Sequence, residues 1–470
     1  MTNQLPTFGR SGCRFFVIAM VGLWVGAACS TAFGQAAATP TSTVSAIPVG
    51  GFPIVNVVGG VSINTDGLLS NVTIDAMGML RKLRMESLQK IPGELNEPTS
   101  TRKISLRRLD EAISQCIKDK KPLPDAICYL AGLQHIDYVF VYPEQHDIVL
   151  VGGGEGWEID KQGTAVGITT HRPVMLLDDL LVALRTARAA ALGGISCSID
   201  PTPEGLARAR QELPSLASSG NPQVLATGLA NALGMQKIRV SGVPSTSHFA
   251  RVLVAADYRM KRLAMAFDPS PVRGLPNYLG MVPSAIHGIL SPRFWLEPEF
   301  EALLRDPDGL AWQLRGSSVK AMTEEDFLTA TGSFTHSGKA SPSAKKWAKL
   351  MTREYPALAV ADSIFGQLQN CMELAVVAAL VAKEGLTERA GQSLPTLLQS
   401  PNLKTAEFVA PTQVESRGSV VAKYRNWIIS ASGGVAINSW GLVQKSQSSE
   451  ALTPLRAKAA PTTGTRWWWN

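Results

Sequence analysis

Residues 138–151 read YVFVYPEQHDIVLV, two apolar runs that flank a short polar link. Both runs are rich in the β-branched and aromatic residues that favour strands. The link, Pro143–Asp147, joins a proline to four polar residues, which is typical of a loop between paired strands. We therefore predict an antiparallel β-hairpin at this point in the chain.

Helical and strand patterns alternate through the rest of the sequence. An apolar stripe at helical spacing begins at Leu177 and stops at Gly193-Gly194, and a short strand is expected at 195–199. This mixture indicates an α+β fold of helices and antiparallel β-hairpins, in one compact mature domain or two closely packed lobes. Further helices are predicted over 76–118, with a break near Pro92 and Pro98, and over 222–233, 246–265 and 342–384. Thr202 is expected to cap another helix, with Pro203 in its first turn. Further strands are predicted over 49–74, 237–240 and 289–322.

Shifts in composition divide the chain into segments. The last of them is polar and ends in Trp467-Trp468-Trp469-Asn470. In chain order we predict a signal peptide (1–34), a flexible linker (35–48), a hairpin and helical N-terminal region (49–174), a mixed α/β central region (175–340), a helical region (341–388), a loop with a C-terminal hairpin (389–446) and a flexible tail (447–470).

One short pattern, Gly-x-x-Ile-[Asn/Asp]-x-x-Gly, occurs three times. It reads GVSINTDG at 60–67, GWEIDKQG at 156–163 and GVAINSWG at 434–441. An Asn or Asp side chain bonds its own backbone two residues on, and the later glycine accepts a positive φ. We therefore predict a hairpin tip at each copy, within hairpins at 54–74, 136–168 and 425–445, and a positive φ at Gly67, Gly163 and Gly441. Because the first and third copies match best, we expect both in antiparallel sheet, and a shared sheet would join the two ends of the chain.

The N-terminus has the features of an export signal. Arg10 and Arg14 precede the uncharged apolar run Phe15–Ala28, and Ala32 and Gly34 supply small residues for cleavage after Gly34. The apolar run is shorter than the roughly 20 residues that a membrane span needs. We expect a cleaved signal and a periplasmic or extracellular protein.

The cysteines leave two alternatives open. Val25–Cys29 loosely resembles a bacterial lipobox, with Gly26 where that pattern prefers leucine, so lipid attachment at Cys29 is the alternative to simple cleavage. Cys116 and Cys128 are candidates for one disulfide, whereas Cys197 lies in an apolar run and is expected in the core.

The formal net charge is +7, and much of the excess lies in residues 81–121. Such a stretch suits anionic polymers or lipid head groups, although a solvated helical face explains it more simply. An exported protein rarely meets nucleic acid, so we expect no such partner. The apolar run Cys371–Ala382 is short and contains Glu373, which indicates a buried core helix and no transmembrane span in the mature chain.

Motifs for cofactors and catalysis are weak. The glycines at 152–156 continue into a strand pattern, whereas a phosphate loop would open a helix. A metal site on the 138–151 hairpin is less favoured than simple turn polarity. Its candidate ligands are His135, Asp137, Glu144, His146 and Asp147. We predict no cofactor and no metal, and the sequence assigns no catalytic residue.

The most polar helix is predicted at 246–265, capped by Thr246 or Ser247. An anion-binding or partner-docking face is one interpretation of its polar side, and a solvated surface is the other. The residues of that side are His248, Arg251, Tyr258, Arg259 and Arg262. The residues expected to be buried are Phe249, Val252, Leu253, Ala256, Met260 and Leu263, with the three arginines more exposed, and Asp257 and Lys261 form an i,i+4 pair.

The segment VSGVP at 240–244 together with HFARVLVAADYRMK at 248–261 resembles a family of exported planctomycete proteins of unknown function. DIVLV at 147–151, EGW at 155–157 and the terminal tryptophans are similar as well. The resemblance covers most of the mature chain. It implies a secreted planctomycete protein and carries no activity or site residue with it.

These observations favour a non-enzymatic extracytoplasmic protein that binds another envelope protein or an anionic polymer. The alternative is a hydrolase acting on an envelope or exported polymer. A deep cleft that gathers His248, Asp257 and other titratable groups would favour the enzyme, and a filled core with shallow surfaces would favour binding.

Overall fold

The computed structural model describes residues 47–48, 57–58, 61–71, 79–283, 288–290, 292–328, 334–336, 340–418, 426–428, 431–460 and 468–470. The predicted signal peptide, its cleavage site, Cys29 and most of the linker lie outside these residues. Their export and lipidation therefore stay predictions.

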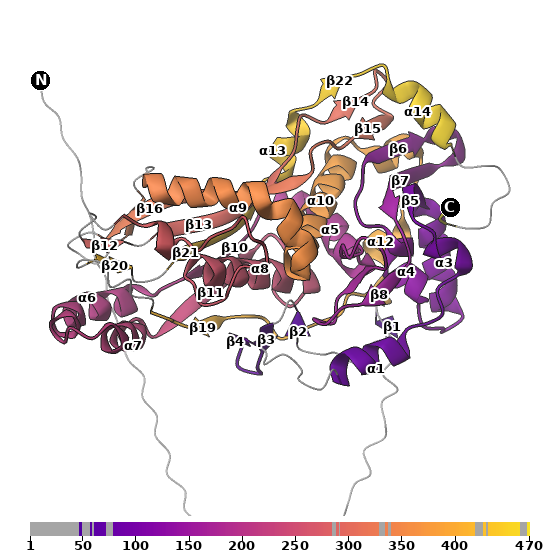
Figure 1. Ribbon diagram of the computed structural model, residues 1–470. Helices are drawn as coiled ribbons and strands as arrows, with labels where there is room; N and C mark the ends of the chain where they lie inside the picture. The colour runs from indigo at the N-terminus through magenta and orange to yellow at the C-terminus, as the bar shows by residue number, and fades with distance from the viewer. Residues whose placement is uncertain are drawn as a thin grey trace, which may run out of the picture. The chain divides into compact units, whose positions relative to one another are not determined.

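The α+β prediction is confirmed by two large sheets and the helices packed on them (Figure 1). One sheet is ten-stranded and mixed. Its order is β17 (Phe334–His336), β16 (Ser318–Leu328), β13 (Pro292–Glu299), β21 (Ser432–Ile437), β10 (Ile195–Asp200), β11 (Met235–Ser241), β19 (Gln413–Glu415), β4 (Leu68–Asn71), β3 (Val61–Ile63), β2 (Val57–Val58).

The second sheet is six-stranded and contains the predicted hairpin. Its order is β22 (Gln447–Ser448), β14 (Leu304–Arg305), β15 (Ala311–Gln313), β6 (Tyr138–Tyr142), β7 (Asp147–Gly154), β5 (Thr99–Ser105). Strands β6 and β7 pair antiparallel, from Tyr138 opposite Val151 to Tyr142 opposite Asp147, which confirms the prediction. Two-stranded ladders join β8 (Trp157–Ile159) to β9 (Ala165–Gly167), β1 (Ile47–Pro48) to β18 (Leu403–Lys404) and β12 (Gly288–Leu290) to β20 (Asn426–Ile428).

Strand β5 corrects the helical prediction for 76–118. Helices occupy only part of that stretch, as α1 (Met79–Ser87), α2 (Gly93–Asn96) and α3 (Leu106–Lys118). The strand pairs with β7, and its buried Arg102 donates to the carbonyls of Leu95 and Glu97 at 3.2 and 3.3 Å. A tertiary partner thus overrides the local helical pattern.

The core helices agree with the sequence pattern. They are α5 (Leu177–Ala190), α8 (His248–Ala264), α9 (Pro342–Ala361) and α10 (Ser363–Lys383). Helix α9 lies along β16, whereas α8 lies against β10 and β21 (Figure 1). Helix α10 is the one described helix long and apolar enough to cross a membrane, and its apolar stretch is wholly buried inside the fold.

Helices α6 (Pro203–Ser218) and α7 (Pro222–Leu233) form the connection from β10 to β11 along the chain. They pack on each other around a small hydrophobic core of their own. As expected, Thr202 caps α6 by accepting from the Gly205 N–H at 3.0 Å. Smaller helices α4 (Asp125–Cys128), α11 (Leu386–Ala390) and α12 (Pro395–Gln399) fill the connections.

Two copies of the repeated pattern are hairpin tips. Asn64 accepts from the N–H groups of Asp66 and Leu68 between β3 and β4, and Asp160 accepts from Gln162 and Thr164 between β8 and β9. The φ angles of Gly67 and Gly163 are 77° and 80°. The turn prediction is confirmed at both.

The third copy is not a hairpin. After β21, Asn438 caps helix α13 (Ser439–Gln444) and accepts from the Gly441 N–H at 2.9 Å. The same side-chain oxygen serves an Asx turn or a helix cap, so the pattern alone does not separate them. Trp440 selects the helix here, because its indole N–H reaches the Ala187 carbonyl of α5 at 2.8 Å. Strand β21 nevertheless shares the ten-stranded sheet with β3 and β4.

The C-terminal residues differ from the expected flexible tail where the structure describes them. They include β22, helix α14 (Leu452–Ala459) and a buried Trp468 that docks beside β5. The cysteines at 116, 128, 197 and 371 are all free thiols, so the candidate pair Cys116 and Cys128 is not bridged. Cys197 is buried, as expected of a core residue.

Candidate functional site

The apolar side of α8 is as predicted, but the exposure expected for its arginines is wrong. Ser247 caps the helix by accepting from the Ala250 N–H, and every residue of the predicted apolar stripe is buried. Arg251 and Arg262 are only 1% and 6% exposed, and Arg259 is half-buried. The helix is surrounded by the sheet and by α5 and α10, so most of its polar side chains are buried.

His248 points at the beginning of α5. Its Nδ1 lies 3.0 Å from both carboxylate oxygens of Asp179. Burial would lower the pKa of His248, but the charges of Asp179 and Asp178 outweigh it and raise that pKa. The Cys371 thiol hydrogen-bonds the same Asp179, and burial holds its pKa well above the ordinary value. The thiol is therefore neither activated nor paired with the imidazole.

A strap formed by residues 405–411 crosses over this cluster. The Ala406 N–H donates to Asp178 at 3.0 Å, and the Phe408 N–H donates to the Thr246 carbonyl at 2.8 Å. Arg251 stacks on the Phe408 ring at 4.5 Å. Burial and the neighbouring charge of Asp179 raise the pKa of Asp178 to about 7, and burial lowers the pKa of Arg251 to about 10.

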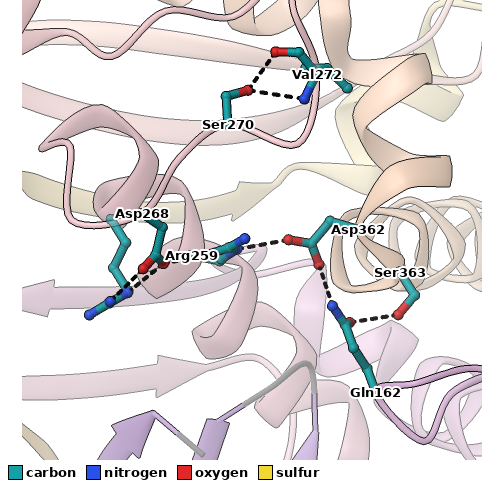
Figure 2. Close-up of polar contacts among 8 residues, drawn as sticks. Gln162, Arg259, Asp268, Ser270, Val272, Asp362 and Ser363 are labelled. Atoms are coloured by element: carbon teal, nitrogen blue, oxygen red, sulfur yellow. Dashed lines mark hydrogen bonds and ion pairs between the residues drawn. The ribbon is translucent and has the colours of Figure 1, made fainter. Parts of the chain in front are cut away.

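Farther along α8, Arg259 joins two carboxylates (Figure 2). Its Nε donates to Asp362 at 2.7 Å, and its Nη1 donates to Asp268. Arg262 donates two hydrogen bonds, of 2.6 and 2.7 Å, to the same Asp268. These bonds are the main reason that the pKa of Asp268 is lowered.

The second hairpin tip is held by the same cluster. Gln162 donates to Asp362 at 3.3 Å and accepts from the Ser363 hydroxyl at 2.8 Å, as Figure 2 shows. Of the arginines predicted as an anion-binding face, Arg259 and Arg262 therefore bind carboxylates of the protein itself, and Arg251 donates to the Val409 carbonyl at 3.1 Å.

Asp257 and Lys261 form the predicted i,i+4 pair, but deep inside the protein. The Lys261 Nζ donates to Asp257 at 2.9 Å, to the Ile199 carbonyl at 3.0 Å and to the Gly433 carbonyl at 3.1 Å. Ile199 lies on β10 and Gly433 on β21. Each is next to the last residue at which these two strands pair with each other, Ser198 opposite Gly434. Burial raises the pKa of Asp257 to about 6 despite the lysine. Lys261 therefore bridges the two strands at the point where their pairing ends. Asp257 is fully buried beside it and does not share a cleft with His248.

The polar residues of the 138–151 hairpin go to separate partners. His135 pairs with Asp137 at 3.2 Å, Asp147 accepts from Ser105 at 2.6 Å, and His146 lies 3.2 Å from the Ala390 carbonyl. Within the described residues, no three His, Cys, Asp or Glu side chains gather as metal ligands.

A groove that the sequence did not single out lies along β11. It has a volume of about 460 Å³. We call it the basic groove, and its lining residues are Thr202, Met235, Gln236, Lys237, Ile238, Arg239, Thr412 and Gln413. Lys237 and Arg239 are both exposed, and no acidic residue belongs to the lining. Two cations at i and i+2 of a strand point to one face, which is the signal that would have located it.

These features define an α+β protein whose central unit, β10 to α8, contains the buried Asp257–Lys261 pair and most of the groove. Residues 197–278, which span that unit, match a protein family described as "Protein of unknown function (DUF1598)". No curated protein and no solved structure was found to match the chain.

Proposed function

We propose that the protein is an exported, non-enzymatic binding protein and that it holds an anionic polymer of the cell envelope in the basic groove. The observation that carries the proposal is the lining itself, which includes Lys237 and Arg239 and no acidic residue. A hollow with positive potential concentrates anionic ligands.

Both cations are available to a ligand. Neither forms an ion pair with any residue that the structure describes. Asp200 lies opposite Lys237 in the β10–β11 register, but on the neighbouring strand and outside the lining. Thr202 and Thr412 add hydroxyl groups and Gln413 adds an amide, which suit phosphate, carboxylate or sugar oxygens.

The arrangement of the titratable groups supports binding over catalysis. His248 and the Cys371 thiol both contact Asp179, so the imidazole is not placed to activate that thiol. Asp257 is bound to a buried lysine, and Asp362 and Asp268 are bound to arginines. Each group is occupied by an internal partner, as expected of groups that hold the fold together.

The test is calorimetric titration of the mature chain, residues 35–470, with short polyphosphate, dextran sulfate and neutral dextran. We expect saturable binding of at least one anionic polymer, weakened by salt, and none of neutral dextran. An exposed charge contact contributes up to about 1 kcal/mol, so the double variant Lys237→Ala/Arg239→Ala should raise Kd about tenfold.

The matched control is Lys118→Ala/Lys120→Ala, which removes the same charge from two exposed lysines at the end of α3. It should leave Kd within about twofold, because salt screens charges that do not touch the ligand. Equal losses in the two double variants, or no binding of either anionic polymer, would contradict the proposal.

A further inference from the structure

Residues 468–470 pair with β5 through one antiparallel bridge. Strand β5 is the end of the six-stranded sheet, and β7 pairs with its inner side. On its outer side, the Ser105 N–H donates to the Trp468 carbonyl at 2.8 Å and the Asn470 N–H donates to the Lys103 carbonyl at 3.2 Å. Between those bonds, Ile104 lies opposite Trp469 in an antiparallel bridge.

The two tryptophans anchor this segment by burial. Trp468 is 5% exposed within the main core, and the half-buried Trp469 packs against the same core. Their rings meet edge to face with centroids 4.5 Å apart. Main-chain bonds to a sheet edge combined with buried side chains are how a sheet binds an extended peptide. The edge of β5 therefore has the features of a peptide-binding site that the chain's own end occupies.

The connection to the rest of the chain is long enough for release. Helix α14 is tied to β6, because Arg456 donates to the Val141 carbonyl at 3.0 Å and its own carbonyl accepts from the Tyr142 hydroxyl at 2.8 Å. From β6 to β5 is two strand spacings, about 10 Å. Eight extended peptide steps from Ala460 to Trp468 reach about 26–29 Å. Release of residues 468–470 from β5 would break no strand pairing of the described residues other than the bridge between Ile104 and Trp469. Figure 1 shows the C-terminus beside α3.

We propose that the edge of β5 is a docking site for a C-terminal Trp-Trp-Asn peptide and that the segment of a second copy binds there by exchange. A second copy carries the identical tripeptide, so it makes identical contacts, and exchange of identical elements links protomers at little cost. The partner is thus another molecule of this chain.

The experiment measures the fluorescence anisotropy of a labelled peptide of residues 461–470 against two forms of the protein. The form truncated after Ala460 leaves the β5 edge empty and should bind the peptide saturably. The full chain should bind it about tenfold more weakly or worse, because its own segment competes at an effective concentration near millimolar. A peptide carrying Trp468→Ala should lose at least about tenfold in affinity for the truncated form.

Equal affinity of the two forms, or no saturable binding to the truncated form, would overturn the proposal. If truncation prevents folding, the full chain with Trp468→Ala takes its place, since its own segment is weakened in the same position. That variant should bind the wild-type peptide at least about tenfold more tightly than the unmodified full chain, and equal affinities would again overturn the proposal. The basic groove takes no part in this measurement, so its result is independent of the proposed function.

Discussion

Replacing Asp178 by asparagine should make the protein more stable at pH 8 but not at pH 4. Asp178 is 6% exposed and adjoins the Asp179 carboxylate, and these two factors raise its pKa to about 7 from 3.8. Between those values the folded state keeps a proton that the unfolded chain has lost. The free energy of unfolding therefore falls as the pH rises from about 4 to about 7.

The size of the effect follows from the shift. A difference of about 3 pH units corresponds to about 4 kcal/mol at pH 8, at 1.36 kcal/mol per unit. Asparagine is nearly isosteric and keeps the oxygen that accepts from the Ala406 N–H. The variant removes the charge and retains the bond, so it should gain up to about 4 kcal/mol at pH 8 and stay within about 0.5 kcal/mol of the wild type at pH 4.

Urea denaturation at intervals from pH 4 to pH 8 measures this difference. Asp308 is exposed, so Asp308→Asn is the control and should leave the free energy of unfolding unchanged at both pH 4 and pH 8. The charge of Asp178 also helps to raise the pKa of His248, so NMR titration of that imidazole should move to lower pH in Asp178→Asn. Parallel stability curves for wild type and Asp178→Asn across the whole range would refute the reasoning.

Other substitutions test the remaining structure. Leu253→Ala should cost about 2–5 kcal/mol in urea denaturation because the side chain is fully buried, and a cost below 1 kcal/mol would show that α8 is placed wrongly. Lys261→Met should cost about 3–5 kcal/mol because it leaves Asp257 buried and unpaired, whereas the double variant with Asp257→Asn should cost less than the sum of the single changes. Gly67→Ala should cost more than about 1 kcal/mol, since φ is 77° and a Cβ would lie 2.4 Å from Thr412 Oγ1, and a neutral result would remove the turn argument. N-terminal sequencing of the secreted protein should begin within a few residues of Gln35, and recovery of an intact Met1 in the cytoplasm would contradict export.

The elements predicted best are those with a strong local signal. The 138–151 hairpin, the cap at Thr202 and the buried stripe of α8 each depend on residues close together in sequence. Strand β5 and helix α13 were missed because their conformations depend on distant partners, β7 for the strand and the Ala187 carbonyl for the helix.

In the candidate site too, the sequence predicted the positions of residues along one helix but not the partners that they bind. The sequence placed His248, Arg259 and Arg262 along one helix, and that placement is correct. It did not show that Asp179 and Asp362 bind two of them, because those acids lie 69 positions from His248 and 103 positions from Arg259. Asp268 lies only 6 positions from Arg262, but it follows the end of the helix, where helical spacing no longer predicts which side chains meet. The basic groove needs β11, the start of α6 and residues 412–413 together, and only the folded chain brings those residues side by side.

By itself the sequence determined the α+β class, the helix periods, two of the three Asx–glycine turns and the residues of the α8 apolar stripe. These follow from backbone preference and side-chain spacing over a few residues, which act before any distant contact forms. Tertiary structure alone decided which charges are buried, which carboxylates bind the arginines of α8, that Asn438 begins a helix, that β5 is a strand, and that the terminal tryptophans dock on its edge. The reason is physical: a charge, an Asx oxygen or a strand edge accepts more than one partner, and long-range packing selects which partner it meets.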